Sequence, residues 1–422
     1  MNYKRLVLIL ALISFTPCLW AQDMNYARKV IKELSSDDYF GRGYINKGDS
    51  IAAAYLSAEM KELKLKNFES NYYQTYSTPI NTLPEDPILK LGKNKLESAK
   101  DFIVYPDSPS CEGTFDVLWL NTEILTKNKI REEFLKKDLS QTFLAIDSVG
   151  LNNKELYNFA SDLVSANLFG AKGVMLRKNK LKYTARTFLK EFPTLIVKNS
   201  KLDTTTSKIT VKIKNQFIDN YKTQNLLGYI QGKTDTCLVY CAHYDHLGMM
   251  GSKIYPGAND NASGVAMVLN LAKHYKNARK KPHYTQVFLL FSGEEAGLLG
   301  SKHYVDHPLF PLEKTRMVMN FDMIGTGSQG IYIFNGKAFP VELALYEKIN
   351  KKHEYVSNMR GTQPVPSSDH ASFYNKDVKA VFFYADGDNA DYHETTDTYE
   401  NLKIGQFEGV FKLVRDFSDQ LK

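Results

Sequence analysis

The chain has 422 residues, of which 43% are hydrophobic and 24% are charged, and a formal net charge of +7. This composition is that of an ordinary globular protein with room for two or three domains, and it excludes a long disordered tail. The charge is mild, and the lysine-rich stretch at 276–281 lacks interleaved aromatic residues, which argues against a nucleic-acid-binding groove.

The N-terminus has the features of a secretory signal. Lys4 and Arg5 precede an apolar run at 6–15 that is too short for a stable bilayer span, and Ala21 offers a cleavage point. Residues 1–21 are therefore expected to be a signal peptide. The mature protein is expected to be exported to the periplasm or the medium, without stable membrane insertion. A lipoprotein site at Cys18 is the alternative, which the preceding proline disfavours.

Residues 22–84 are expected to form the N-terminal part of a catalytic domain. The pattern at 25–66 predicts a helix, a turn and a second helix, and residues 72–76 predict a strand.

Residues 85–212 have the pattern of a separate, inserted domain of α/β or β-rich type. One helix is predicted at 155–169, and strands are predicted at 115–120, 142–147, 172–177 and 193–198. This segment contains no histidine and no cluster of metal-binding side chains. It is therefore interpreted as a lid or spacer.

Residues 213–422 are expected to form the main part of the catalytic domain. A helix is predicted at 263–277, and strands are predicted at 225–230, 236–241, 286–291, 317–321, 331–334 and 380–384. Such alternation predicts an α/β fold with a mixed, mostly parallel central sheet flanked by helices. All nine histidines lie in this part of the chain, so any chemistry that needs imidazole belongs here.

Polar side chains follow three of the predicted strands. His243 and Asp245 follow the strand at 236–241, Glu294 and Glu295 follow the strand at 286–291, and Asp322 follows the strand at 317–321. Ligands bind at the carboxyl ends of strands in open α/β sheets, so these side chains are expected to meet at one edge. A fourth pair, Tyr392-His393, lies in a loop after the strand at 380–384.

The loop 257–264 places Asp260 among small residues, near the start of the predicted helix. A carboxylate can bridge two cations, whereas an imidazole has one lone pair for a metal. We therefore expect two zinc ions, because mixed nitrogen and oxygen ligation without thiolate suits a catalytic zinc site. One ion would take His243 and Asp322, the other His393 and Glu295, and Asp260 would be shared.

The remaining acidic residues suggest catalytic roles. Glu294 adjoins a ligand in sequence but is free itself, so it can act as general base toward a water acidified by the metals. Asp245 could hold the second ring nitrogen of His243. His370 is a further residue that could approach a substrate, and the pocket wall is expected from the segment 355–375 and from the insert.

The cysteines indicate free, buried thiols. Cys237 and Cys241 lie four residues apart in a predicted strand, which separates them by about 13 Å, too far for a disulfide. A bridge from Cys111 is left open.

These motifs closely resemble the co-catalytic zinc aminopeptidase family, which includes bacterial leucyl and Streptomyces-type aminopeptidases and glutamate carboxypeptidases. The matching segments are 242–246, 257–264, 291–301, 320–325, Tyr392-His393 and Asp397-Thr398. The resemblance implies the five ligands above, Glu294 as base and a cis peptide bond after Asp260. It also implies that Tyr392 stabilises the tetrahedral intermediate. The segment 85–212 resembles a divergent protease-associated insert.

The leading hypothesis is therefore an exported zinc metallopeptidase that removes N-terminal residues from peptides or proteins, by way of a water shared by two zinc ions. The enzymatic alternatives on the same fold are a glutaminyl cyclase with one zinc and a carboxypeptidase. A carboxypeptidase would need basic groups for the substrate carboxylate, and Arg316 and Arg360 are candidates. The non-enzymatic alternative is a receptor-like binding protein on a peptidase scaffold, which would have lost ligands.

Overall fold

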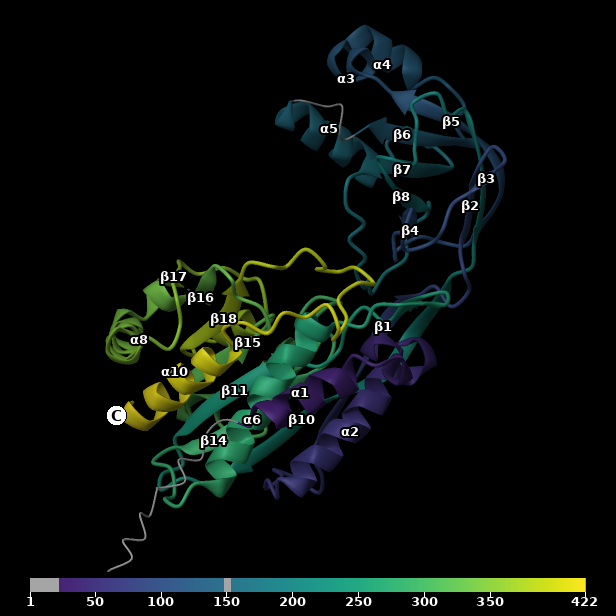
Figure 1. Ribbon diagram of the computed structural model, residues 1–422. Coiled ribbons are helices and arrows are strands. Elements are labelled where there is room, and N and C mark those ends of the chain that lie inside the picture. Colours follow the sequence, from purple (N-terminus) through teal and green to yellow (C-terminus); the bar gives the residue numbers. More distant parts are fainter. Residues whose placement is uncertain (1–22, 148–152, 422) are drawn as a thin grey trace, which may run out of the picture.

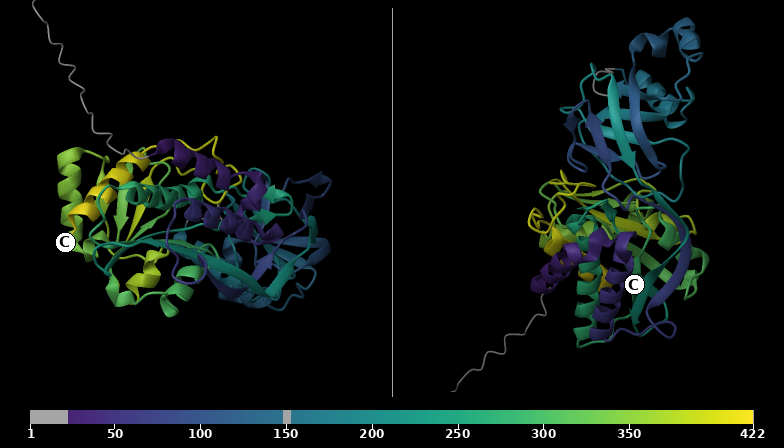
Figure 2. Two further views of the ribbon diagram at one scale, coloured as in Figure 1. Left: turned by 90° about the horizontal axis from the view of Figure 1, so that it is seen from below. Right: turned by 90° about the vertical axis from the view of Figure 1, so that its right-hand side faces the viewer.

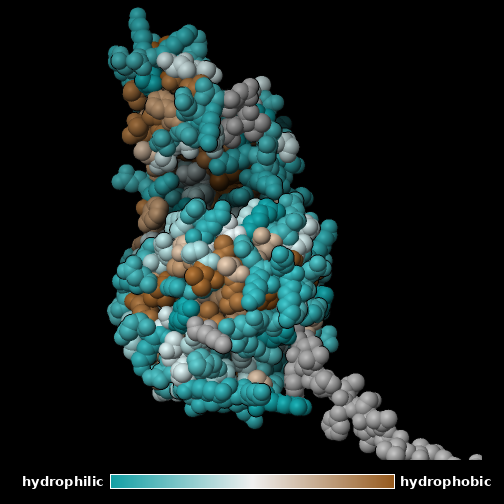
Figure 3. Space-filling view, turned by 90° about the vertical axis from the view of Figure 1, so that its left-hand side faces the viewer, coloured by the Kyte–Doolittle hydropathy of each residue, from teal (hydrophilic) through white to brown (hydrophobic). Residues whose placement is uncertain are grey.

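The computed structural model describes residues 23–147 and 153–421, so the expected signal peptide lies outside the described residues. Two eight-stranded sheets dominate the fold, and helices pack against both (Figure 1). The second sheet lies beyond one end of the strands of the first (Figure 2). The face seen in Figure 3 is hydrophilic over much of its area, carries a hydrophobic patch on the larger part, and is hollowed between the two parts.

The first sheet is mixed, with four adjacent parallel strands at its centre. Its order is β1-β10-β14-β11-β15-β18-β16-β17, and β14, β11, β15 and β18 run parallel to one another. β10 pairs antiparallel with both β1 and β14, and β16 pairs antiparallel with β18. The bounds are β1 Tyr73–Thr82, β10 Gln216–Ile230, β11 Cys237–His243, β14 Thr285–Phe291, β15 Thr315–Phe321, β16 Gly330–Phe334, β17 Met359–Gly361 and β18 Ala380–Asp386.

The central strands are buried on both faces, which explains their continuous apolar sequences. In β11, Leu238 and Tyr240 pack into the core on one face, and Val239 and Cys241 pack into the core on the other. The larger core holds the helices α1 Met24–Leu34, α2 Gly48–Glu62, α6 Ser263–Asn277, α8 Pro340–His353 and α10 Phe407–Gln420. The opposite face is covered by α7 Leu299–Asp306 and α9 His370–Tyr374.

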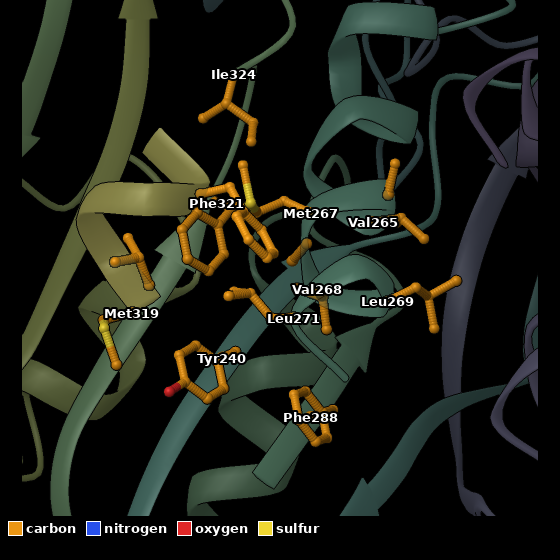
Figure 4. Packing of buried hydrophobic residues seen from close by; sticks show 14 of the residues in the cluster. Tyr240, Val265, Met267, Val268, Leu269, Leu271, Phe288, Met319, Phe321 and Ile324 are labelled. Atoms are coloured by element: carbon orange, nitrogen blue, oxygen red, sulfur yellow. The ribbon is translucent and has the colours of Figure 1, made fainter. Parts of the chain in front are cut away.

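Helix α6 is the centre of the larger core. Met267, Val268 and Leu271 project toward aromatic and aliphatic side chains of the sheet, among them Tyr240 and Phe288 (Figure 4). Asn261 is tied to the first turn of this helix, because its Oδ1 accepts a hydrogen bond from the Gly264 amide at 2.8 Å. The helix therefore fixes the position of the loop that precedes it.

The second sheet is formed by residues 88–213 and ends one residue beyond the segment 85–212 that was predicted to be an insert. Its order is β3-β2-β9-β5-β6-β7-β8-β4, with parallel pairing from β5 to β8. The strands are β2 Ile88–Leu91, β3 Asn94–Lys95, β4 Phe102–Val104, β5 Cys111–Leu120, β6 Thr142–Asp147, β7 Gly173–Lys178, β8 Thr194–Lys198 and β9 Lys208–Ile213. One face packs against α3 Thr122–Thr126, α4 Asn128–Phe134 and α5 Lys154–Ser165.

The two parts share a hydrophobic core. Leu247, Met250 and Tyr255, from the segment after β11, pack with the other face of the second sheet. This segment includes the short ribbon of β12 Met249–Met250 and β13 Lys253–Ile254. The second sheet is therefore packed onto the part of the chain that holds the first sheet and is not merely linked to it.

The predicted α/β architecture is confirmed, with local differences. Helix α5 ends at Ser165 instead of 169, because Asn167 has φ 47° and its side chain bonds the Ala171 backbone at 2.8 and 3.0 Å. The thiols of Cys111, Cys237 and Cys241 are buried and free, as predicted. The described ranges contain no helix that is long and apolar enough to cross a membrane.

Candidate metal centre

The polar side chains predicted from the strand ends meet at one edge of the first sheet. β11 ends at His243, β14 ends just before Ser292-Gly293-Glu294-Glu295, and β15 ends just before Asp322. These strands are adjacent and parallel, so their carboxyl ends share an edge. The loop after β18, the next parallel strand, brings Tyr392 and His393 to the same place.

Asp260 lies between two imidazoles. Its Oδ1 is 3.4 Å from Nε2 of His243, and its Oδ2 is 3.4 Å from Nε2 of His393. His243 Nε2 also lies 3.3 Å from Asp322 Oδ1, and His393 Nε2 lies 3.2 Å from Glu295 Oε2. The arrangement thus consists of two imidazole–carboxylate sets that share one carboxylate.

Both imidazoles present a lone pair to these carboxylates. His243 Nδ1 donates to the Asp245 carbonyl at 3.1 Å, and His393 Nδ1 donates to the Tyr183 carbonyl at 2.8 Å. A carbonyl can only accept, so the proton of each neutral ring sits on Nδ1 and Nε2 is a bare acceptor. His243 Nε2 is buried and has no hydrogen-bond partner among the described residues.

A metal cation fits this chemistry. Ligand atoms about 2.0–2.2 Å from a tetrahedral zinc are about 3.3–3.6 Å apart, and the observed separations of 3.2–3.4 Å match that edge. Burial lowers the pKa of His393, but the carboxylates of Glu295 and Asp260 together outweigh burial, and the pKa rises to about 11. The carboxylates therefore favour a positive charge here, which a metal supplies while leaving the imidazole neutral.

Two other side chains lie close enough to be considered as ligands. Glu294 groups with His243 and Asp322, and His246 groups with Asp260 and Glu295. Glu294 Oε2 is 4.0 Å from His243 Nε2, farther than the other carboxylates. His246 Nδ1 is 2.7 Å from Glu295 Oε1, a direct hydrogen bond that orients this carboxylate. We therefore favour His393 over His246 as the ligand.

The Asp245 carboxylate is hydrogen-bonded to the backbone of the turn that carries Glu294. Burial raises the pKa of Glu294 well above its usual range. Asp245 Oδ1 and Oδ2 accept the amides of Glu294 and Glu295 at 3.1 and 3.4 Å. Asp245 was expected to hold His243 through its carboxylate, but the main-chain carbonyl makes that contact, and the carboxylate is 3.8 Å from the ring. The carboxylate instead positions the Glu294-Glu295 turn.

The loop that carries Asp260 is held from two sides. The fully buried Arg42, at the end of the 3₁₀ helix Asp37–Arg42, donates to the carbonyls of Gly257 and Asp260 at 2.8 and 3.1 Å. The Asp397 carboxylate accepts the amides of Asn259 and Asp260 at 2.9 and 3.0 Å. The peptide bond after Asp260 is cis, as the resemblance implied. The Asp260 carboxylate is therefore attached to a firmly anchored backbone.

Seven of the eight predicted site residues line one cavity of about 430 Å³, and Asp245 lies buried beneath it. The expected contributions to its wall are present: Ser367 comes from the segment 355–375, and Lys180 and Lys182 come from the insert. The rest of the wall is mainly apolar and includes Met323, Phe334, Phe382 and Tyr384.

Arg316 and Arg360, the candidates for holding a substrate carboxylate, do not line this cavity. Arg316 pairs with Glu342 at 2.9 Å, and Arg360 lies 3.6 Å from Asp386. Both guanidinium groups are thus engaged elsewhere, and they lend no support to the carboxypeptidase alternative.

Three supporting residues could not be assigned from the sequence. These residues are His246, Arg42 and Ser368. Ser368 Oγ donates to Asp322 Oδ2 at 2.8 Å, so it orients that carboxylate. His246 is the last residue of the matched segment 242–246, which was the one available signal for its role.

His370 is part of the core and does not line the cavity. It is fully buried, and its Nε2 donates to the Val365 carbonyl at 3.0 Å. Its burial lowers its pKa to about 4. The suggestion that it approaches the substrate is therefore not supported.

The buried His370 predicts a pH dependence of stability. As the pH falls below about 6.5, the unfolded chain protonates this histidine and the folded chain does not. His370 therefore lowers the free energy of unfolding by about 1.4 kcal/mol for each pH unit between about pH 6.5 and its folded pKa of about 4. Denaturant titrations between about pH 7 and 5 should give a shallower fall for His370→Gln than for the native chain. Equal slopes would contradict the expectation.

The parallel strands carry imidazole and carboxylate side chains at their carboxyl ends, a set of donor atoms that suits a divalent metal ion. Residues 225–418, somewhat less than half of the chain, match the model of peptidase family M28. The chain is 28% identical to the aminopeptidase YwaD of Bacillus subtilis over 260 residues, which is 56% of this chain and 54% of that protein. It is 35% identical to a Pseudomonas aeruginosa aminopeptidase over 133 residues, 29% of this chain and 24% of that one.

Solved structures share the whole fold. BSAP, a zinc aminopeptidase from Bacillus subtilis, matches with a TM-score of 0.66 and 22% identity, covering 93% of each chain. A peptidase M28 precursor from Shewanella amazonensis matches with a TM-score of 0.68 and 18% identity, covering 94% of this chain and 93% of that one. The sequence match with YwaD spans about half the length of that protein. The structural match with BSAP covers nearly the whole chain and therefore includes the insert.

Proposed function

We propose that this chain is an exported zinc aminopeptidase that binds two metal ions. The observation that carries the proposal is the position of Asp260, whose two carboxylate oxygens each lie 3.4 Å from an imidazole Nε2, one of His243 and the other of His393. His243 and Asp322 would complete one site, and His393 and Glu295 the other. Zinc held here would polarise the scissile carbonyl and acidify a water.

The chain's own groups then have distinct tasks. Glu294, which lines the cavity beside the proposed ligands, takes a proton from the attacking water and passes it to the leaving amine. Tyr392, also in the wall, stabilises the negative charge that develops on the carbonyl oxygen. Asp245 positions the turn that carries Glu294. The apolar part of the wall suits an uncharged first side chain.

A substrate panel tests this proposal. Leucine p-nitroanilide and peptides with a free N-terminus should be cleaved, whereas the same compounds with an acetylated amine should not. Dialysis against a chelator should abolish cleavage, and zinc should restore it at two ions per chain, measured by elemental analysis. Cleavage of the acetylated peptides would reject an aminopeptidase. Ammonia release from N-terminal glutamine at one zinc per chain would indicate a glutaminyl cyclase.

A further inference from the structure

Two lysines of the insert line the cavity together with the proposed metal ligands. Lys180 and Lys182 lie in the connection between β7 and β8 of the second sheet, more than sixty residues before His243. The insert thus forms part of the wall of the cavity, in addition to any role as a spacer.

This connection is fixed against the catalytic part beside His393. The Tyr183 carbonyl accepts from His393 Nδ1 at 2.8 Å, and the Tyr183 amide donates to the His393 carbonyl at 3.3 Å. The Tyr183 ring stacks on that of Tyr255, with centroids 4.7 Å apart. Both lysines lie within three residues before Tyr183. Their backbone is therefore anchored by the same residue that orients His393, a proposed ligand.

Neither ammonium group has an acidic partner in the part of the chain that the structure describes. Lys182 Nζ lies 4.9 Å from the centroid of the Tyr392 ring, and Lys180 Nζ lies 3.4 Å from the Ala390 carbonyl. Within residues 23–147 and 153–421, neither lysine forms an ion pair with a carboxylate. The cavity carboxylates of Asp260, Glu295 and Asp322 face the imidazoles instead. The wall therefore offers two cations that a ligand can neutralise.

We propose that Lys180 and Lys182 bind a carboxylate on the second residue of the substrate, just beyond the scissile bond. This inference rests on the proposed peptidase function and adds a substrate class to it. The Tyr392 ring stacks on that of His393 at 3.9 Å, which brings Lys182 close to the proposed ligands. A carboxylate on the second residue lies about one extended residue, or about 3.5 Å, beyond the scissile carbonyl, on the scale of these ring contacts.

The carboxylate has two possible sources: the C-terminus of a dipeptide, or the side chain of an acidic second residue. Two pairs of substrates separate them. Leu-Gly is compared with Leu-Gly-amide, and Leu-Glu-amide with Leu-Gln-amide. For the zinc-loaded enzyme, kcat/KM should favour the carboxylate member of at least one pair by about tenfold, and added salt should reduce the preference.

Substitution of the lysines completes the test. In the K180M/K182M double variant the ratio within the favoured pair should fall to about one, and each single substitution should lower it in part. K172M, at an exposed lysine of the insert that does not line the cavity, should keep the native ratio. The proposal fails if the native enzyme shows no preference, or if the double variant retains it. Failure to cleave even the uncharged substrates would instead reject the peptidase function.

Discussion

Glu294→Gln should lower kcat by about 10²–10⁴-fold while the zinc content stays at the native level. The glutamine amide has nearly the same shape as the carboxylate but cannot accept a proton from water. The proposed ligands remain intact, because the atoms that surround His243 Nε2 most closely belong to Asp260 and Asp322. Turnover of leucine p-nitroanilide and elemental analysis of the same sample measure the two effects.

Glu295→Gln is the matched contrast. The two glutamates are neighbours, but Glu295 Oε2 lies 3.2 Å from His393 Nε2 and its Oε1 accepts from His246. Loss of this negative charge should therefore remove zinc as well as activity. Near-native turnover by Glu294→Gln would refute its role as the base, and zinc loss from that variant would make it a ligand.

The candidate site could be predicted because it depends on strand direction. Parallel strands end at the same edge, so apolar runs followed by His243, Glu294 and Asp322 predicted their proximity without knowledge of the strand order. The buried helix 263–277 was predicted at its observed bounds, because its apolar residues and the preceding small residues are strong local signals.

Features that depend on contacts between residues far apart in the sequence were not predicted. Residues 216–222 are mostly exposed, yet they form the first half of β10 by pairing with β1, so no apolar alternation indicated a strand. In the sequence, Lys180 has no feature that distinguishes it from other surface lysines. Its place in the cavity wall depends on the packing of the insert beside His393. The partners of Arg42 are backbone carbonyls, to which sequence gives no clue.

Arg42→Met should lower the free energy of unfolding by at least about 3 kcal/mol. The guanidinium is completely buried and donates five hydrogen bonds, to the carbonyls of Leu34, Tyr244, Pro256, Gly257 and Asp260. Methionine fills much of the volume but donates nothing, and each buried acceptor left unpaired costs about 1–3 kcal/mol.

The same substitution should weaken zinc binding, because two of these carbonyls belong to the loop that presents the Asp260 carboxylate. Denaturant titration of the metal-free chain measures the stability change, and a competitive zinc chelator measures the affinity. Arg28→Met, at an exposed arginine of α1, is the control and should change neither. Lysine at position 42 keeps the charge but cannot reach carbonyls on several sides, so it should recover only part of the loss. A methionine variant with native stability and native zinc affinity would mean that the loop keeps its shape without the guanidinium.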